Sequence, residues 1–213
     1  MYSNILFDLD GTITDPGEGI TNSVAYALEK FGIKNTDRSE LYCFIGPPLK
    51  ESFAKYYGLN EEQAVKAVEE YRVYFKSGGM FENTVYDGVE SMLAGLRSKG
   101  KKLFIATSKP EEFAVTILEH FGLDKYFDRI CGASMDGIRS EKADVIAYTL
   151  DVCGITNKAE TVMIGDRKHD IIGASANGID SVGVLYGYGS LDELTEAKAT
   201  YIAKSVDDIS RLV

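Results

Sequence analysis

Two acidic residues, separated by a single position, follow the first apolar stretch of the chain in the string Asp8-Leu9-Asp10-Gly11-Thr12. Carboxylates with this spacing leave the end of a strand on the same side, so one can attack phosphorus while the other handles the leaving-group proton. Gly11 permits a sharp turn and its amide can face an anion, so we expect Gly11 and Thr12 to contact a substrate. The alternative is that the two acids only cap a turn.

Hydroxyl and ammonium groups follow a second apolar stretch, in the string Thr107-Ser108-Lys109-Pro110. A strand that ends in hydroxyl groups before a helix offers oxygen and amide donors to phosphate, so Thr107, Ser108 and Lys109 are candidate site residues. Taken alone, Thr107 or Ser108 is more often a helix cap. Further along, Lys142 stands at the start of an apolar-periodic helix, where the helix dipole disfavours a cation, and a solvated surface lysine is the alternative there.

Acidic residues also follow the apolar stretch that ends at Gly165, where Asp166 and Asp170 stand four positions apart. The two side chains lie on one face if a helix begins at once. Hard carboxylate oxygens that meet those of the first strand suit Mg²⁺, which keeps several waters and needs few protein ligands. We therefore expect a magnesium site, with a helix cap as the alternative for Asp166.

Short buried strands must position these residues, because each candidate group directly follows an apolar stretch of four to six residues. The predicted strands are 5–9, 102–107, 129–133, 161–165 and 180–185. They alternate with segments of helical period, which predicts an α/β fold with a Rossmann-like parallel sheet whose ligands bind at the carboxyl ends of the strands. One helix is predicted to open at Asp87, with Asp87 as its cap and Glu90 completing a capping box.

One long segment interrupts the alternation, because the stretch from about Thr14 to Asn83 carries helix signals but no credible strand. Helices are predicted over 16–31, 48–57 and 61–75, and a four-helix cap over the sheet fits this pattern. The breaks at 11–15 and 77–85 are expected to be two hinge strands. We therefore expect a core of residues 1–13 and 84–213, with residues 14–83 inserted as a helical cap.

Composition limits the classes of partner. The chain has 213 residues and a formal net charge of −10, so its field repels nucleic acid and anionic membrane, and a small molecule is the expected partner. The three cysteines show no CxxC spacing, which argues against a disulfide framework and a zinc site. The amino-terminal segment lacks the pattern of a signal peptide, and no apolar run is long enough to span a bilayer, so a cytoplasmic location is expected.

In this order, the four motifs resemble those of the haloacid dehalogenase-like hydrolase superfamily, and the match runs over nearly the whole chain. An inserted helical cap between the first and second motifs is similar to the subclass that holds phosphoglycolate phosphatases and related 5'-nucleotidases. The resemblance implies that Asp8 is the nucleophile and Asp10 the general acid and base, with Thr107 and Lys142 on the transferring phosphoryl group. It also implies that Asp8, the Asp10 carbonyl and Asp166 hold Mg²⁺, supported by Asp170.

The chain departs from the family pattern at two positions. Many relatives carry Lys-Pro where this chain has Lys142-Ala143, so Lys125 and Arg139 are alternatives for the phosphate-binding cation. Relatives of the phosphoglycolate type often place a small serine where this chain has Arg167, which weakens any transfer of substrate identity. The string 44–50 in the inserted segment is similar to the family's substrate-specificity loop, and it makes Lys50 a candidate substrate-binding residue; a plain Gly-Pro helix entry is the alternative.

The expected function is that of a magnesium-dependent phosphatase, which hydrolyses small phosphomonoesters of the phosphoglycolate or nucleoside monophosphate type through an aspartyl-phosphate on Asp8. A phosphomutase of the same superfamily would share the Asp8 chemistry but shield the phosphoenzyme from water. A non-catalytic regulator that binds a phosphorylated metabolite is the alternative from another class, and Asp10 argues against it because a sensor has no need of a general acid. Neither the physiological substrate nor the oligomeric state follows from the sequence.

Overall fold

The computed structural model describes residues 2–34 and 37–213, and the chain divides into two compact units. One unit, here called the core unit, contains residues 1–15 and 85–213, and the other, here called the helical unit, contains residues 16–84. In the described part of the chain, no helix combines the length and the apolar character that crossing a membrane requires.

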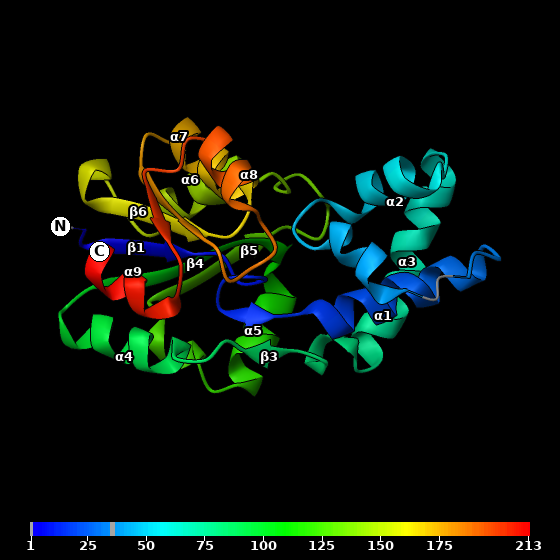
Figure 1. The fold of residues 1–213 in the computed structure, drawn as a ribbon, viewed down its shortest axis with the longest axis horizontal. Coiled ribbons are helices and arrows are strands. Elements are labelled where there is room, and N and C mark those ends of the chain that lie inside the picture. Colours follow the sequence, from blue (N-terminus) through cyan, green and yellow to red (C-terminus); the bar gives the residue numbers. More distant parts are fainter. Residues whose placement is uncertain (1, 35–36) are drawn as a thin grey trace. The chain divides into compact units, whose positions relative to one another are not determined.

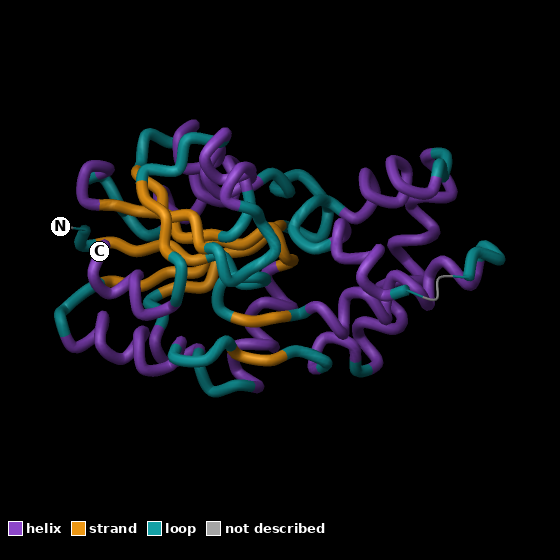
Figure 2. Tube along the Cα trace, viewed as in Figure 1, coloured by secondary structure: helices purple, strands orange, loops and turns teal. Residues whose placement is uncertain are grey.

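A six-stranded sheet forms the centre of the core unit, in the order β5-β4-β1-β6-β7-β8 (Figures 1 and 2). All five neighbouring pairs are parallel, which confirms the expected Rossmann-like α/β fold. Four predicted strands are found within one or two residues of the expected ends, while β4 extends three residues further and β8 was not predicted. The strands are β1 (Asn4–Phe7), β4 (Lys102–Pro110), β5 (Arg129–Ala133), β6 (Thr161–Gly165), β7 (Asp180–Val184) and β8 (Tyr201–Ala203).

Helices cover both faces of this sheet, as a parallel sheet with buried, almost continuously apolar strands requires. In Figure 1, α6 and α7 lie on one face, and α4, α5 and α9 lie on the other. The inner face of α6 packs Val145, Ile146 and Leu150 into a cluster with residues of β1, β4 and β6. The helices are α4 (Val89–Ser98), α5 (Glu111–His120), α6 (Lys142–Val152), α7 (Lys168–Ala176), α8 (Leu191–Glu196) and α9 (Val206–Leu212), with 3-10 helices η3 (Asp124–Tyr126) and η4 (Lys158–Glu160).

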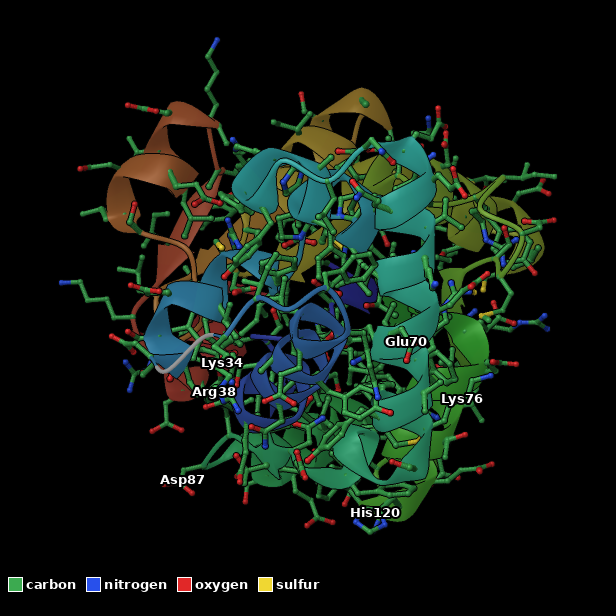
Figure 3. The ribbon with its side chains drawn as sticks, turned by 90° about the vertical axis from the view of Figure 1, so that its right-hand side faces the viewer. Lys34, Arg38, Glu70, Lys76, Asp87 and His120 are labelled. Atoms are coloured by element: carbon green, nitrogen blue, oxygen red, sulfur yellow. The ribbon has the colours of Figure 1, made fainter. Side chains whose placement is uncertain are left out.

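The start of α4 differs from the prediction. The helix begins at Val89, and its N-cap is Gly88 with a φ of 84°, a conformation that suits glycine. Asp87 is exposed and lies at the periphery of the view in Figure 3. Instead of completing a capping box, Glu90 accepts hydrogen bonds from the Tyr126 hydroxyl and the Lys125 ammonium. The predicted cap at Asp87 was therefore wrong, because a tertiary contact takes the Glu90 carboxylate.

Among its described residues, the helical unit contains the three predicted helices as α-helices, within two residues of their expected ends, together with two 3-10 helices. Buried residues along α1 and α3 pack these two helices against each other. Gly19 of α1 also approaches Gly79 of η2 so closely that a Cβ on Gly19 would lie 1.9 Å from the Gly79 carbonyl oxygen. Asn60 starts α3 with a capping box to Gln63. The elements are α1 (Gly17–Lys30), η1 (Arg38–Phe44), α2 (Leu49–Tyr57), α3 (Glu61–Ser77) and η2 (Gly79–Phe81).

Two short strands, β2 (Thr14–Asp15) and β3 (Thr84–Val85), lie where the chain passes from one unit to the other. They pair with each other in a separate two-stranded sheet, visible as the small orange pair in Figure 2. Strand β2 begins only a few residues after Asp8 and Asp10, so the chain first passes from the core unit to the helical unit directly after these two acids.

Candidate active site

Sheet topology brings the four sequence motifs together. Strand β1 lies between β4 and β6, and Phe7, its last residue, is paired in register with Ile105 on one side and Ile164 on the other. The residues that follow β1 therefore lie beside the end of β4 and the loop after β6. The carboxyl edge of a parallel sheet is where ligands bind in open α/β folds, so this edge is the candidate active site.

Lys142 lies against the Asp8 carboxylate. Its ammonium is 2.8 Å from Asp8 Oδ1 and 2.8 Å from Asp170 Oδ1, and it donates a hydrogen bond of 3.1 Å to the Ala106 carbonyl oxygen. Only 5% of Lys142 is exposed, so the alternative of a solvated surface lysine was wrong. Burial alone would lower the pKa of this ammonium, but the carboxylates of Asp170 and Asp8 raise it, so Lys142 stays charged.

Three buried carboxylates form an acidic group at the same place. Asp8, Asp166 and Asp170 each offer an oxygen, and these oxygens lie within 4.8 Å of one another. Burial, followed by the charges of Asp170 and Asp8, raises the pKa of Asp166 well above its usual range. Burial also raises the pKa of Asp170 to about 6, against the opposing effect of Lys142. One lysine does not balance three carboxylates, so the group has an excess of buried negative charge that a cation would relieve.

Two glycines allow the carboxylates to approach the backbone. Gly11 has a φ of 81°, and a Cβ at this position would lie 2.2 Å from Asp166 Oδ2. At Gly165, a Cβ would lie 2.1 Å from the Asp170 carboxyl carbon. No side chain larger than hydrogen fits at either position while the acids keep their places. The turn that Gly11 was expected to make is therefore present, and it also provides space for Asp166.

Asp10 is paired with a lysine that was expected to contact substrate. Lys109 Nζ lies 2.8 Å from Asp10 Oδ2, and both side chains are largely buried. Burial raises the pKa of Asp10, and the charge and hydrogen bond of Lys109 act in the opposite direction. Among the residues that the structure describes, the other oxygen, Asp10 Oδ1, has no hydrogen-bond partner. The two oxygens of Asp10 therefore have different environments.

Thr107 and Ser108 belong to the extended end of β4 and do not cap a helix. The following helix, α5, has Pro110 at its N-cap, so the cap interpretation of these two hydroxyls was wrong. Thr107 is buried, and its Oγ1 accepts a hydrogen bond of 3.2 Å from the Lys109 amide. Thr12 is fully buried as well, and its hydroxyl has no hydrogen-bond partner within the described ranges.

The two alternative cations are engaged elsewhere. Lys125 pairs with Glu90 at 3.2 Å on the surface. Arg139 donates to the Gly132 carbonyl at 2.9 Å and lies 3.4 Å from Glu111. Of the three candidates, Lys142 is thus the one that the structure places against Asp8.

Two further basic residues also have acidic partners. Arg167 lies 2.9 Å from Glu193 of α8, so it ties the loop after β6 to that helix. Lys50 belongs to the helical unit, where it stands in the first turn of α2 and pairs with Glu61 at 2.8 Å.

A loop that sequence reasoning missed also borders Asp166. It comprises residues 185–190 and follows β7, and its Tyr188 amide donates a hydrogen bond of 2.8 Å to Asp166 Oδ2. A Cβ at Gly187 would lie 2.4 Å from the Asp166 Cβ, so this glycine is required by the close approach. The Tyr186 hydroxyl donates to the Thr12 carbonyl at 3.0 Å. The alternation of tyrosine and glycine directly after a strand that ends at the same edge was the available signal.

Comparison with known proteins places this site in a family. Residues 5–184 match the family described as "Haloacid dehalogenase-like hydrolase". The chain is 48% identical over 200 residues to a 5'-nucleotidase of Pseudomonas aeruginosa, covering 94% of this chain and 90% of that protein. It is 39% identical over 207 residues to the tyrosine-protein kinase PtkA of Mycobacterium tuberculosis, covering 96% of this chain and 70% of that protein.

A solved structure is similar over the full length of the chain. The crystal structure of a predicted phosphatase from Clostridium acetobutylicum is 52% identical, has a TM-score of 0.96, and covers 100% of this chain and 98% of that chain. The match in sequence, the parallel sheet and the acidic residues at its carboxyl edge agree with one another. The chain belongs to the haloacid dehalogenase-like hydrolases, and within that family it is a phosphatase.

Proposed function

We propose that this phosphatase hydrolyses small phosphomonoesters through an aspartyl-phosphate on Asp8 and that it depends on Mg²⁺. The observation that carries the proposal is the Asp8 carboxylate, which is buried between the Lys142 ammonium and the acidic group of Asp166 and Asp170. A carboxylate oxygen held next to a cation in this way can act as a nucleophile. The lysine and the cation site also compensate the charge of an approaching phosphate.

The acidic group fits a magnesium ion. Asp166 Oδ1 is buried and has no hydrogen-bond partner in the part of the chain that the structure describes, which is unusual for a carboxylate oxygen. All three side chains offer hard oxygen ligands, the type that Mg²⁺ prefers. Asp8, the Asp10 carbonyl and Asp166 would hold the ion, and Asp170 would support them. When bound, Mg²⁺ would neutralise part of the charge on the transferring phosphoryl group.

The residues of the chain have separate tasks in the proposed reaction. An oxygen of Asp8 attacks phosphorus in line, the bond between phosphorus and the ester oxygen breaks, and Asp10 gives its proton to the departing oxygen. Asp10 then takes a proton from water, and the water oxygen attacks the phosphorus of the aspartyl-phosphate. The bond between phosphorus and the Asp8 oxygen breaks, which releases inorganic phosphate and restores the Asp8 carboxylate. The raised pKa of Asp10 suits a residue that must carry a proton before the first step. Thr107 and Lys142 would bind the phosphoryl oxygens.

The identity of the substrate is proposed at the level of its class. The 5'-nucleotidase relative supports a nucleoside monophosphate, and phosphoglycolate is the alternative within the same class of small phosphomonoesters. We propose that residues of the helical unit, among them Lys50, select the substrate as a cap domain. A panel of nucleoside monophosphates, sugar phosphates and 2-phosphoglycolate, assayed by release of inorganic phosphate, ranks these substrates by kcat/KM.

Trapping the phosphoenzyme tests the mechanism. After rapid mixing with a labelled nitrophenyl phosphate and an acid quench, wild type should carry label on Asp8 and the Asp8→Asn variant should carry none. The Asp10→Asn variant should still be labelled, because nitrophenolate needs little protonation to leave, and its label should persist because water is not activated. Label on Asp8→Asn, or wild-type turnover by Asp10→Asn, would overturn the proposal. Transfer of the label to a second substrate hydroxyl, without release of phosphate, would indicate a mutase.

A further inference from the structure

The extended end of β4 carries a buried lysine into the site. The pairing of β4 with β5 shifts register between Thr107 and Pro110, and Lys109 lies within this irregular stretch. Its ammonium is 2.8 Å from Asp10 Oδ2, and its side chain is only 5% exposed. A buried ammonium is stable only when it is paired, and here a carboxylate is its ion-pair partner. The lysine and Asp10 therefore hold each other in place.

This ion pair distinguishes the two oxygens of Asp10. Oδ2 is held by Lys109, whereas Oδ1 is buried and lacks a hydrogen-bond partner among residues 2–34 and 37–213. A carboxyl group rotates readily about its last torsion, so an unrestrained Asp10 would present either oxygen in many orientations. Holding one oxygen leaves the other in a defined position.

We propose that Lys109 is a positioning residue, which orients Asp10 so that Oδ1 exchanges the proton with the leaving group and with water. This inference rests on the function proposed above, in which Asp10 is the general acid and base. It replaces the expectation that Lys109 binds the substrate phosphate. The Lys109 amide, which donates to Thr107 Oγ1, is a separate contact that side-chain substitutions leave in place.

Dependence on the leaving group separates the two roles. A residue that positions the general acid matters only when the leaving oxygen needs a proton, whereas a phosphate-binding residue matters equally for every ester. Replacing Lys109 by Met removes the ion pair and keeps the length of the side chain. We expect kcat/KM for adenosine 5'-monophosphate or 2-phosphoglycolate, whichever is the better substrate, to fall by roughly 10²-fold, the lower end of the contribution of general acid catalysis. For 4-nitrophenyl phosphate we expect a loss of less than about tenfold.

A double-mutant comparison sharpens the test. If Lys109 acts through Asp10, adding Lys109→Met to Asp10→Asn should change kcat/KM for the alkyl phosphate by less than about twofold. Lys109→Arg keeps the positive charge and should restore part of the loss. Equal losses on both types of ester, a rise in KM alone, or additive losses in the double variant would each overturn the proposal.

Lys101 provides the matched control. It is also buried, but its ammonium donates to the Tyr2 carbonyl at the opposite end of the sheet. Lys101→Met therefore loses a buried ammonium without touching Asp10, and its ratio of alkyl to nitrophenyl kcat/KM should equal that of wild type. If circular dichroism shows that Lys109→Met does not fold, Lys109→Gln takes its place. The criterion stays the ratio of kcat/KM for the alkyl phosphate to kcat/KM for 4-nitrophenyl phosphate.

The phosphoenzyme experiment keeps the two proposals separable. Suppose that wild type carries label on Asp8 but the Lys109 variant keeps the wild-type ratio of alkyl to nitrophenyl kcat/KM. This result would overturn only the role of Lys109. Wild type without label would overturn the proposed function itself, before any Lys109 variant is considered.

Discussion

The two ends of the core sheet both bury polar side chains, but they satisfy them differently. At the amino end, the Tyr2 hydroxyl donates to Asp180 at 2.7 Å, the Lys101 ammonium donates to the Tyr2 carbonyl, and the Thr161 hydroxyl donates to the Asn157 carbonyl at 2.8 Å. At the carboxyl end, three carboxylates lie within 4.8 Å of one another with a single buried lysine between them, and one oxygen of Asp166 has no hydrogen-bond partner in the described segments.

This difference separates a structural end from a functional end of one sheet. Groups that only stabilise the fold complete their hydrogen bonds within the protein. In the proposed function, the groups at the carboxyl end bind a cation and a phosphate. Such groups need acceptor atoms without protein partners, and their carboxylates repel one another, so they cost stability in the ligand-free protein. We therefore expect changes at the carboxyl end to alter catalysis and changes at the amino end to alter stability.

Removal of the divalent ion should give the largest effect. The acidic group repels the phosphate unless a cation compensates its charge, so exhaustive chelation should reduce turnover of 4-nitrophenyl phosphate to the background rate. Added Mg²⁺ should restore it, and Ca²⁺ should inhibit because its looser coordination disturbs the in-line geometry. Turnover that survives chelation would remove the magnesium assignment.

Gly187→Ala should have the next largest effect. The new Cβ would lie 2.3 Å from the Gly11 carbonyl oxygen and 2.4 Å from the Asp166 Cβ, so the loop after β7 or Asp166 must move. A displacement of about 1 Å at a catalytic group costs about 10²-fold, which is the expected loss in kcat/KM. Titration with Mg²⁺ should show weaker binding as well.

Gly95→Ala is the matched control for this substitution. A Cβ there meets no heavy atom of the described residues within 4 Å, and the position lies within α4. The change should leave kcat/KM unchanged and raise stability by about 0.5–1 kcal/mol, since alanine is the better helix former. A wild-type rate in Gly187→Ala would show that the loop does not position Asp166.

The stability of the metal-free protein should depend on pH through the acidic group. Burial raises the pKa of Asp166, and it raises that of Asp170 to about 6, whereas an unfolded Asp titrates near pH 3.9. Their contribution to stability is therefore fully present below about pH 4 and is lost as the pH rises through the folded pKa. In the presence of chelator, the Tm of wild type relative to Asp166→Asn should fall as the pH rises above about 4.

Magnesium should reverse this trend, because it binds the ionised carboxylates. The rise in Tm caused by Mg²⁺ in wild type should be larger at pH 7 than at pH 5, by mass action on the deprotonated group. Asp166→Asn should show little rise at either pH. Scanning calorimetry with and without Mg²⁺ measures both quantities, and an equal rise in the variant would argue against Asp166 as a ligand.

Tyr2→Phe should give the smallest effect and confine it to stability. The substitution removes the hydrogen bond of 2.7 Å to Asp180 at the amino end of the sheet. Loss of one such bond costs about 1 kcal/mol, which lowers Tm by about 2–4 °C in a protein of this size. The kcat/KM for 4-nitrophenyl phosphate should stay within twofold of the wild-type value, which corresponds to a change of about 0.4 kcal/mol in activation free energy. A large loss of activity would contradict the division between the two ends.

Much of the fold could be predicted because its signals are local. Five strands are short apolar runs, and the acidic motifs directly follow two of them. Strand β8 was missed because its three residues are too few to establish a period of two. The predicted cap at Asp87 was wrong because cap preferences describe isolated helix ends. Here Gly88, in the left-handed conformation, is the N-cap of α4, and Glu90 accepts a hydrogen bond from Tyr126 instead of completing a capping box.

The sequence by itself determined the family, the order of the four motifs along the chain, and Asp8 and Asp10 as the leading acids. Only the tertiary structure decided that Lys142 meets Asp8, that Lys109 pairs with Asp10, and that the loop at 185–190 borders Asp166. The physical reason is the distance along the chain: these pairs join residues that are far apart in sequence. Their proximity follows from the order of the parallel strands in the sheet, β5-β4-β1-β6-β7, which no local period encodes.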